Sequence, residues 1–143
     1  ILIRDPHAAI YSWYHTAIDR WGANVPDRPA WILDAYRHYD AFYTAAFAVQ
    51  KNAPDRTCLL RFEDLKANVS ELDRLIAFLG IKPKLSPAFV HWWTEFERMT
   101  QPGPRTFYRH GSNERWRTDT AWLADLKRAA PGDFSRFGYP EQP

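Results

Sequence analysis

The first recurring pattern of apolar residues lies in the N-terminal part of the chain. Its members follow one another at spacings of 4, 3, 1 and 3 residues: Ile10, Tyr14, Ala17, Ile18 and Trp21. This spacing is one face of an α-helix. Asp5 before Pro6 is typical of a helix start, because Asp accepts from free backbone N–H groups and Pro fits the first turn. The pattern predicts a helix that begins at Pro6 and ends at Gly22.

A second, longer stripe predicts a helix from about residue 30 to residue 51. Its apolar positions recur at spacings of 4, 3, 4 and 3, and three more aromatics widen it: Ile32, Tyr36, Tyr39, Tyr43 and Ala46, with Trp31, Phe42 and Phe47. The stretch from Ala23 to Pro29 contains two prolines. It is predicted as the loop between the two helices.

Two short apolar runs predict strands, Ile1 to Ile3 and Thr57 to Phe62. Their composition is typical of buried strands. Because the order of strand, helix, helix, strand and helix belongs to layered α/β folds, we expect the two strands to share one parallel sheet. Two strands make a small sheet, so we expect the others upstream of residue 1 or in another chain.

Two more helices are predicted in the second half of the chain. The first presents Leu72, Leu75, Ile76 and Leu79, with Ser70 as its N-cap in a pattern resembling a capping box with Asp73, and with Gly80 after its end. The second opens at Ser86-Pro87 and carries Phe89, Val90, Trp93 and Phe96.

The last part of the chain is predicted as a long loop followed by one helix. Residues 100 to 116 contain two prolines and two glycines with little periodicity, and long loops in compact domains are often functional. The final helix is expected to start near Thr118, to present Trp122 and Leu126, and to end before Pro131.

Composition narrows the class of protein. The chain has 143 residues, which suits a single domain, with 45% hydrophobic and 25% charged residues. Its net charge of +2 excludes the strongly basic surface typical of nucleic-acid binding. The apolar runs are too short to span a membrane. A lone cysteine, Cys58, excludes an internal disulfide and is expected to be a small buried hydrophobe. No cluster has metal-ligand spacing, so we expect no metal.

The start of the sequence leads to a further expectation. The only methionine is Met99, and the chain begins within a predicted strand. We therefore expect a segment of a longer protein, in which any targeting peptide would precede residue 1. The cytoplasm is then only the default compartment, and the sequence does not predict an oligomeric state.

Four groups of residues are candidates for chemistry. Arg4 stands at the carboxyl end of a predicted strand, where α/β sheets bind ligands, and Ser12 adds a hydroxyl. Arg109, His110 and Gly111 open a basic stretch that continues to Arg117, a composition typical of anion binding. Phe62 ends the second strand, and residues 91 to 99 hold several aromatics able to stack on a base. Taken singly, each is as well explained by packing or by a solvated surface.

In their order and spacing these groups resemble the sulfotransferases that use 3′-phosphoadenosine 5′-phosphosulfate (PAPS). Four stretches match motifs of that family: Arg4-Asp5-Pro6 with Ser12, Phe62-Glu63-Asp64-Leu65-Lys66, Thr94-Glu95-Phe96-Glu97-Arg98-Met99, and Arg109-His110-Gly111 through Trp116-Arg117. The match extends over positions 4 to 117, most of the chain. The resemblance implies the C-terminal part of a three-layer fold of the P-loop NTPase type, with a parallel sheet and mostly helical in this segment. The chain would then be one partial domain, truncated at its N-terminal side.

The resemblance also implies roles for nine residues in binding PAPS as co-substrate. Arg4, Ser12 and Arg109 would hold the 3′-phosphate, with His110 beside them and backbone N–H groups near Gly111. Phe62, Thr94 and Phe96 would surround the adenine, and Met99 would pack near the nucleotide. Three positions depart from the family motifs: Phe62 replaces a tyrosine, His110 a lysine, and Glu114 a glycine.

The catalytic parts of such an enzyme are expected upstream of residue 1. The 143 residues contain no P-loop sequence, and no motif marks His7, His15, His38 or His91 as the catalytic base. We therefore expect sulfuryl transfer only from the intact protein, to a hydroxyl or amine of a small-molecule or carbohydrate acceptor. Two alternatives stay open: a non-catalytic nucleotide-binding or interaction remnant, and a phosphotransferase related to P-loop nucleotide kinases.

Overall fold

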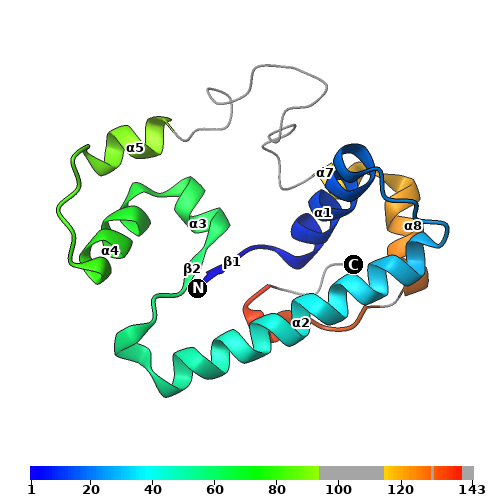
Figure 1. Ribbon diagram of the computed structural model, residues 1–143, viewed down its shortest axis with the longest axis horizontal. Coiled ribbons are helices and arrows are strands. Elements are labelled where there is room, and N and C mark those ends of the chain that lie inside the picture. Colours follow the sequence, from blue (N-terminus) through cyan, green and yellow to red (C-terminus); the bar gives the residue numbers. More distant parts are fainter. Residues whose placement is uncertain (94–114, 130, 140–143) are drawn as a thin grey trace. The chain divides into compact units, whose positions relative to one another are not determined.

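The structure is a computed structural model that describes residues 1–93, 115–129 and 131–139. The described chain is mostly helical, with a two-stranded parallel sheet (Figure 1). It forms two compact units. Unit 1 consists of residues 1–4 and the described part of 49–111, and unit 2 of residues 5–48 and the described part of 112–143.

The sheet of unit 1 pairs β1 (Leu2–Ile3) with β2 (Leu60–Arg61). The strands are parallel, as predicted, with Leu2 opposite Leu60 and Ile3 opposite Arg61. The backbone N–H of Leu60 donates to the carbonyl of Ile1 at 2.8 Å. Ile3, Cys58 and Leu60 are buried around this pair. The prediction that Cys58 is a buried hydrophobe is therefore confirmed.

The second strand is shorter than the predicted run from Thr57 to Phe62. A 3-10 helix, η1 (Pro54–Arg56), precedes it, and the helix α3 (Phe62–Ala67) follows it directly. Phe62 is thus the first residue of a helix rather than the last of a strand. Glu63 and Asp64 lie in the first turn of α3, where negative charge stabilises a helix. The run of β-prone residues up to Phe62 favoured a strand in the sequence analysis, so the start of α3 at Phe62 was not predicted.

Two further helices complete the described part of unit 1, α4 (Val69–Leu79) and α5 (Pro87–Trp93). Gly80 ends α4, as predicted. Its φ of 62° is in the left-handed region, which glycine adopts readily at the end of a helix. Ser86 begins α5, where its Oγ accepts from the N–H of Phe89 at 3.2 Å. No residue of α4 is buried by the described residues, and Leu79 is 53% exposed.

The N-cap of α4 differs from the prediction. The side chain of Asn68, not of Ser70, occupies the cap, and its Oδ1 accepts from the N–H of Ser70 at 3.0 Å. Asn68 has the extended backbone of a cap residue, with φ −140° and ψ 118°. Ser70 is already the second residue of the helix, so its side chain cannot serve as the cap.

We expect Asn68→Ala to lower the free energy of unfolding of unit 1 by about 1 kcal/mol, because one N–H of the first turn loses its acceptor. Ser70→Ala is the matched control, and it should change stability by less than about 0.5 kcal/mol. Urea denaturation followed by circular dichroism measures both. A larger loss for Ser70→Ala than for Asn68→Ala would contradict the assignment of the cap.

Unit 2 is built on α1 (Pro6–Trp21) and most of α2 (Arg28–Asn52). The predicted start and end of α1 are confirmed. The Asp5 carboxylate accepts from the N–H of Ala8 at 2.9 Å, and Gly22 has a φ of 64°. The loop before α2 ends at Asp27, so the helix starts two residues earlier than predicted. Asp27 Oδ1 accepts from the N–H of Ala30 at 3.0 Å.

Three short elements close the described part of unit 2: α7 (Arg115–Thr118), α8 (Thr120–Ala129) and the 3-10 helix η2 (Ser135–Phe137). The predicted loop from 100 to 116 is therefore wrong at its last two residues, which are helical. The final helix starts at Thr120, two residues after the predicted start near Thr118, and Asp119 separates it from α7. Its Oδ1 accepts from the N–H of Trp122 at 2.9 Å and begins α8.

The core of unit 2 combines apolar residues from all of its helices. The buried side chains include Ile10, Ile32, Tyr36, Trp116, Trp122, Phe134 and Phe137. Two predicted members of the apolar stripes are exposed instead, Trp21 by 64% and Phe42 by 66%. Trp21 is the last residue of α1. Phe42 precedes Tyr43 by one residue, which at 3.6 residues per turn places it about 100° around the helix from that stripe.

Candidate functional site

The structure brings two of the predicted nucleotide-binding residues together in unit 1. Arg4 directly follows β1, and Phe62 directly follows β2. The Cζ atom of Arg4 lies over the Phe62 ring, 5.0 Å from its centroid. Both side chains are half-buried. Because the carboxyl ends of parallel strands meet at one edge of a sheet, the two residues stand where α/β folds bind ligands.

The contact between Arg4 and Phe62 is a cation–π interaction, in which the cation is attracted by the negative face of the ring. An arginine carries its five N–H donors around the edge of a planar group. The cation–π contact restrains the position of the guanidinium, whereas hydrogen bonds to an oxyanion use its N–H groups. The geometry is suited to binding a phosphate or sulfate group at this edge of the sheet.

The third described residue of the predicted site, Ser12, belongs to unit 2. It is exposed on α1, and its backbone carbonyl accepts from the Oγ1 of Thr16 at 2.9 Å. Exposure keeps its hydroxyl accessible to a ligand. Because Arg4 belongs to unit 1, their convergence on one phosphate stays a prediction.

Six residues of the predicted site lie outside the described residues: Thr94, Phe96, Met99, Arg109, His110 and Gly111. Their roles stay predictions. The end of the basic stretch is described, in α7. Trp116 is buried in α7, and the Cζ atom of Arg117 lies 5.0 Å from the centroid of the Trp116 ring. Trp116 therefore belongs to the core of unit 2 rather than to a solvated loop.

A cluster around His7 in unit 2 has no signature in the sequence. The hydroxyl of Tyr36 donates to His7 Nδ1, and the His7 ring stacks on Trp116 with centroids 4.7 Å apart. Burial lowers the pKa of His7, with a further lowering by Arg117, and the charge of Asp5 opposes both. Burial also raises the pKa of Tyr36, so its hydroxyl keeps its proton. The Nδ1 atom of a neutral His7 therefore accepts the hydrogen bond from the Tyr36 hydroxyl.

We expect the stability of unit 2 to fall as the pH drops below about 7. The pKa of His7 is lower in the folded protein than its ordinary value of about 6.5 in an unfolded chain. The unfolded chain therefore binds more protons in this range, and acid favours it. Urea midpoints between about pH 7.5 and 5 measure the effect, which His7→Gln should reduce.

The control for this experiment is His38→Gln, since the side chain of His38 is 69% exposed on α2. That variant should keep the wild-type slope of stability against pH. Burial also lowers the pKa of His15, so His7→Gln is expected to reduce the slope without abolishing it. An unchanged slope in His7→Gln would exclude the contribution of His7.

A second polar cluster joins α1 to the start of α8. The hydroxyl of Tyr11 donates to Asp119 Oδ2 at 3.1 Å, and the ring of His15 lies against Tyr11 with centroids 4.5 Å apart. Burial and the hydrogen bond to Asp119 raise the pKa of Tyr11. These contacts tie α8 to α1, so the cluster is explained by structure.

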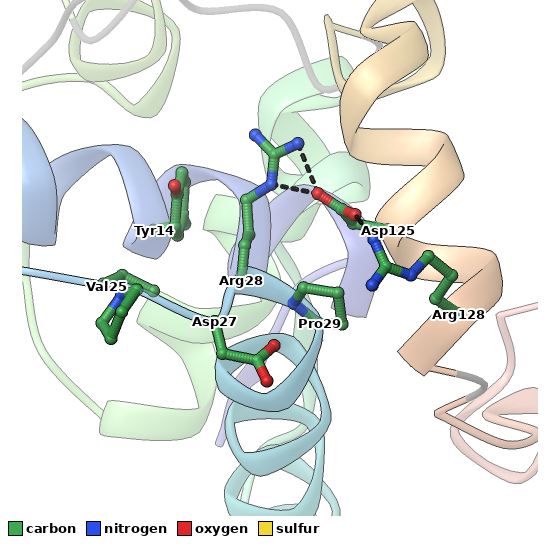
Figure 2. Close-up of a pocket in the computed structure, with 8 residues that line it drawn as sticks. Tyr14, Val25, Asp27, Arg28, Pro29, Asp125 and Arg128 are labelled. Carbon is green, nitrogen blue, oxygen red and sulfur yellow. Dashed lines mark hydrogen bonds and ion pairs between the residues drawn. The ribbon is translucent and has the colours of Figure 1, made fainter.

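Unit 2 also contains an open hollow of about 540 Å³ beside the loop before α2. Figure 2 shows Arg28 between Tyr14 and Asp125, with its ion pair drawn. Arg28 Nε donates to Asp125 Oδ2 at 2.5 Å, and Arg128 Nη1 donates to Asp125 Oδ1 at 3.2 Å. Burial alone would lower the pKa of Arg28, but Asp125 raises it above its usual range. These charges pair with one another, and the Arg28–Asp125 ion pair joins the start of α2 to α8, so the charged residues around the hollow are best explained by a structural role.

No protein-family model matches the sequence, and no curated protein or solved structure is significantly similar to it. Within the described ranges, no helix has the length and apolar composition needed to cross a membrane. The same ranges contain no group of three His, Cys, Asp or Glu side chains placed to hold a metal ion.

Proposed function

We propose that this chain is the nucleotide-binding segment of a PAPS-dependent sulfotransferase. It would bind the 3′-phosphoadenosine part of PAPS, and the intact protein would transfer the sulfuryl group to a hydroxyl or amine of an acceptor. The observation that carries the proposal is the meeting of Arg4 and Phe62 at the carboxyl ends of β1 and β2. They come from two separate motifs of the family, 58 positions apart in the sequence.

The chemistry of the pair supports a phosphate ligand. A 3′-phosphate is close to doubly charged at neutral pH, and arginine binds such groups through charge-assisted hydrogen bonds. In this proposal Arg4 contacts the 3′-phosphate, joined by Ser12, Arg109, His110 and the backbone near Gly111. Thr94, Phe96 and Met99 surround the base.

The implied reaction is an in-line sulfuryl transfer, for which phosphoryl transfer is an analogy. Such reactions depend on positioning and on positive charge at the leaving group. The phosphosulfate loop and the catalytic histidine would come from the longer protein. The residues of this chain would hold the donor by its nucleotide end, so we expect no turnover from this chain alone.

Calorimetry with adenosine 3′,5′-bisphosphate, in the presence of a metal chelator, tests the proposal. We expect binding of this nucleotide to be at least tenfold tighter than that of adenosine 5′-monophosphate, since a charge-assisted contact contributes about 1.5–3 kcal/mol. ATP with magnesium is the comparison for the phosphotransferase alternative. Tighter binding of ATP with magnesium, or no binding of the bisphosphate, would reject the sulfotransferase assignment.

A second measurement separates the enzyme from a non-catalytic remnant. The chain is expressed together with the sequence that precedes it in its gene, and transfer of sulfate from PAPS to a panel of hydroxyl and amine acceptors is followed. Turnover by this longer protein supports the enzyme. Bisphosphate binding without turnover on any acceptor favours the remnant.

A further inference from the structure

The ring of Phe62 has a neighbour that the family resemblance does not predict. The resemblance places Phe62 beside the adenine, whereas in the structure the Arg4 guanidinium lies over the ring face, with Cζ 5.0 Å from the centroid. We propose that Phe62 is a positioning residue for Arg4, which holds the guanidinium so that its edge donors meet the 3′-phosphate. This inference rests on the proposed function and assigns Phe62 a different role within it.

The sheet itself produces this contact. Ile3 is opposite Arg61 in the parallel register, and Arg4 and Phe62 are the residues that directly follow the two strands. The pairing of β1 with β2 therefore brings the first residue of α3 close to Arg4, and the Phe62 ring contacts the flexible arginine side chain there.

A held guanidinium binds an anion better than a free one. An arginine side chain loses rotamer freedom when it forms a fixed contact. A ring that already restricts it reduces this loss when the arginine binds a phosphate. From the usual size of a cation–π contact, we expect a gain of about twofold to fivefold in affinity for the 3′-phosphate.

The two roles of Phe62 are distinguished by comparing two nucleotides. Affinities for adenosine 3′,5′-bisphosphate and for adenosine 5′-monophosphate are measured by calorimetry on the wild-type chain, Phe62→Leu and Phe62→Tyr. A residue that acts through Arg4 affects only the nucleotide with a 3′-phosphate. We expect Phe62→Leu to bind the bisphosphate about twofold to fivefold more weakly and the monophosphate unchanged. Phe62→Tyr, which keeps the ring, should retain wild-type affinity for the bisphosphate.

Combination with Arg4→Gln gives an independent measure. In that background Phe62→Leu should have no further effect on bisphosphate binding, because the group it positions is gone. An equal loss for both nucleotides in Phe62→Leu would show that the ring contacts the adenine, and would overturn the positioning role. Unchanged binding of both would overturn it as well. A wild-type chain that binds neither nucleotide rejects the proposed function, and this inference with it.

Discussion

Replacing Arg4 by glutamine is expected to weaken the binding of adenosine 3′,5′-bisphosphate by about tenfold to hundredfold. Glutamine keeps donor groups on a similar stem but removes the positive charge. A hydrogen bond to a charged group contributes about 1.5–3 kcal/mol, and each 1.4 kcal/mol is about tenfold in affinity. Calorimetry on the wild type and the variant measures the change directly.

Arg56→Gln is the matched control for this experiment. Arg56 is an exposed arginine of η1 in the same unit, and it precedes β2, so the substitution removes one charge without changing a residue that follows the carboxyl end of either strand. It should change bisphosphate affinity by less than about twofold at physiological salt, where distant exposed charges are screened. If Arg4→Gln binds as well as Arg56→Gln does, Arg4 is not a phosphate ligand.

The second large effect concerns the core of unit 2. Trp122→Ala is expected to lower the free energy of unfolding by about 3–5 kcal/mol, the usual cost of removing a buried tryptophan. The side chain is 0% exposed. Its ring meets Tyr11 edge-on, with centroids 5.0 Å apart, and Tyr14 at 5.4 Å. Urea denaturation followed by circular dichroism measures the loss.

Two further variants keep this prediction testable if Trp122→Ala does not fold. Trp122→Phe should cost less than Trp122→Ala, because a ring still fills part of the space. The indole N–H of Trp122 also has no hydrogen-bond partner among the described residues, so its removal breaks no such bond there. Trp21→Ala, at a position 64% exposed, should change stability by less than about 0.5 kcal/mol. Similar losses for Trp122→Ala and Trp21→Ala would contradict the packing of unit 2.

Local signals in the sequence predicted much of the fold. Asp5, Pro6 and Gly22 bound α1 through interactions within a few residues, and the sequence contains all of these partners. The parallel pairing of the two strands followed from the order of the elements, and the structure confirms it. Where two polar residues competed for a cap, as at Asn68 and Ser70, only the backbone conformation decided between them.

The contacts that were missed depend on distant parts of the chain. His7 meets Tyr36, 29 positions later, and Trp116, which lies beyond the long segment between α5 and α7. No short motif encodes such a cluster, and the lowered pKa of His7 depends on its burial in the folded unit. The resemblance placed Arg4 and Phe62 at one ligand, and the structure brings them together in unit 1. The cation–π contact between them depends on the strand register, which composition and periodicity do not predict.

The short parallel register of β1 and β2 makes this edge of unit 1 sensitive to insertions as well as to substitutions. Each added residue in a strand sends the following side chain to the opposite side of the sheet. One alanine inserted within β2, between Leu60 and Arg61, would break the pairing of Ile3 with Arg61 and move Phe62, the first residue of α3, away from Arg4. One residue added in the exposed stretch from 81 to 86, between α4 and α5, leaves that register untouched. Tolerance to changes in length should therefore differ sharply between two segments only about twenty residues apart.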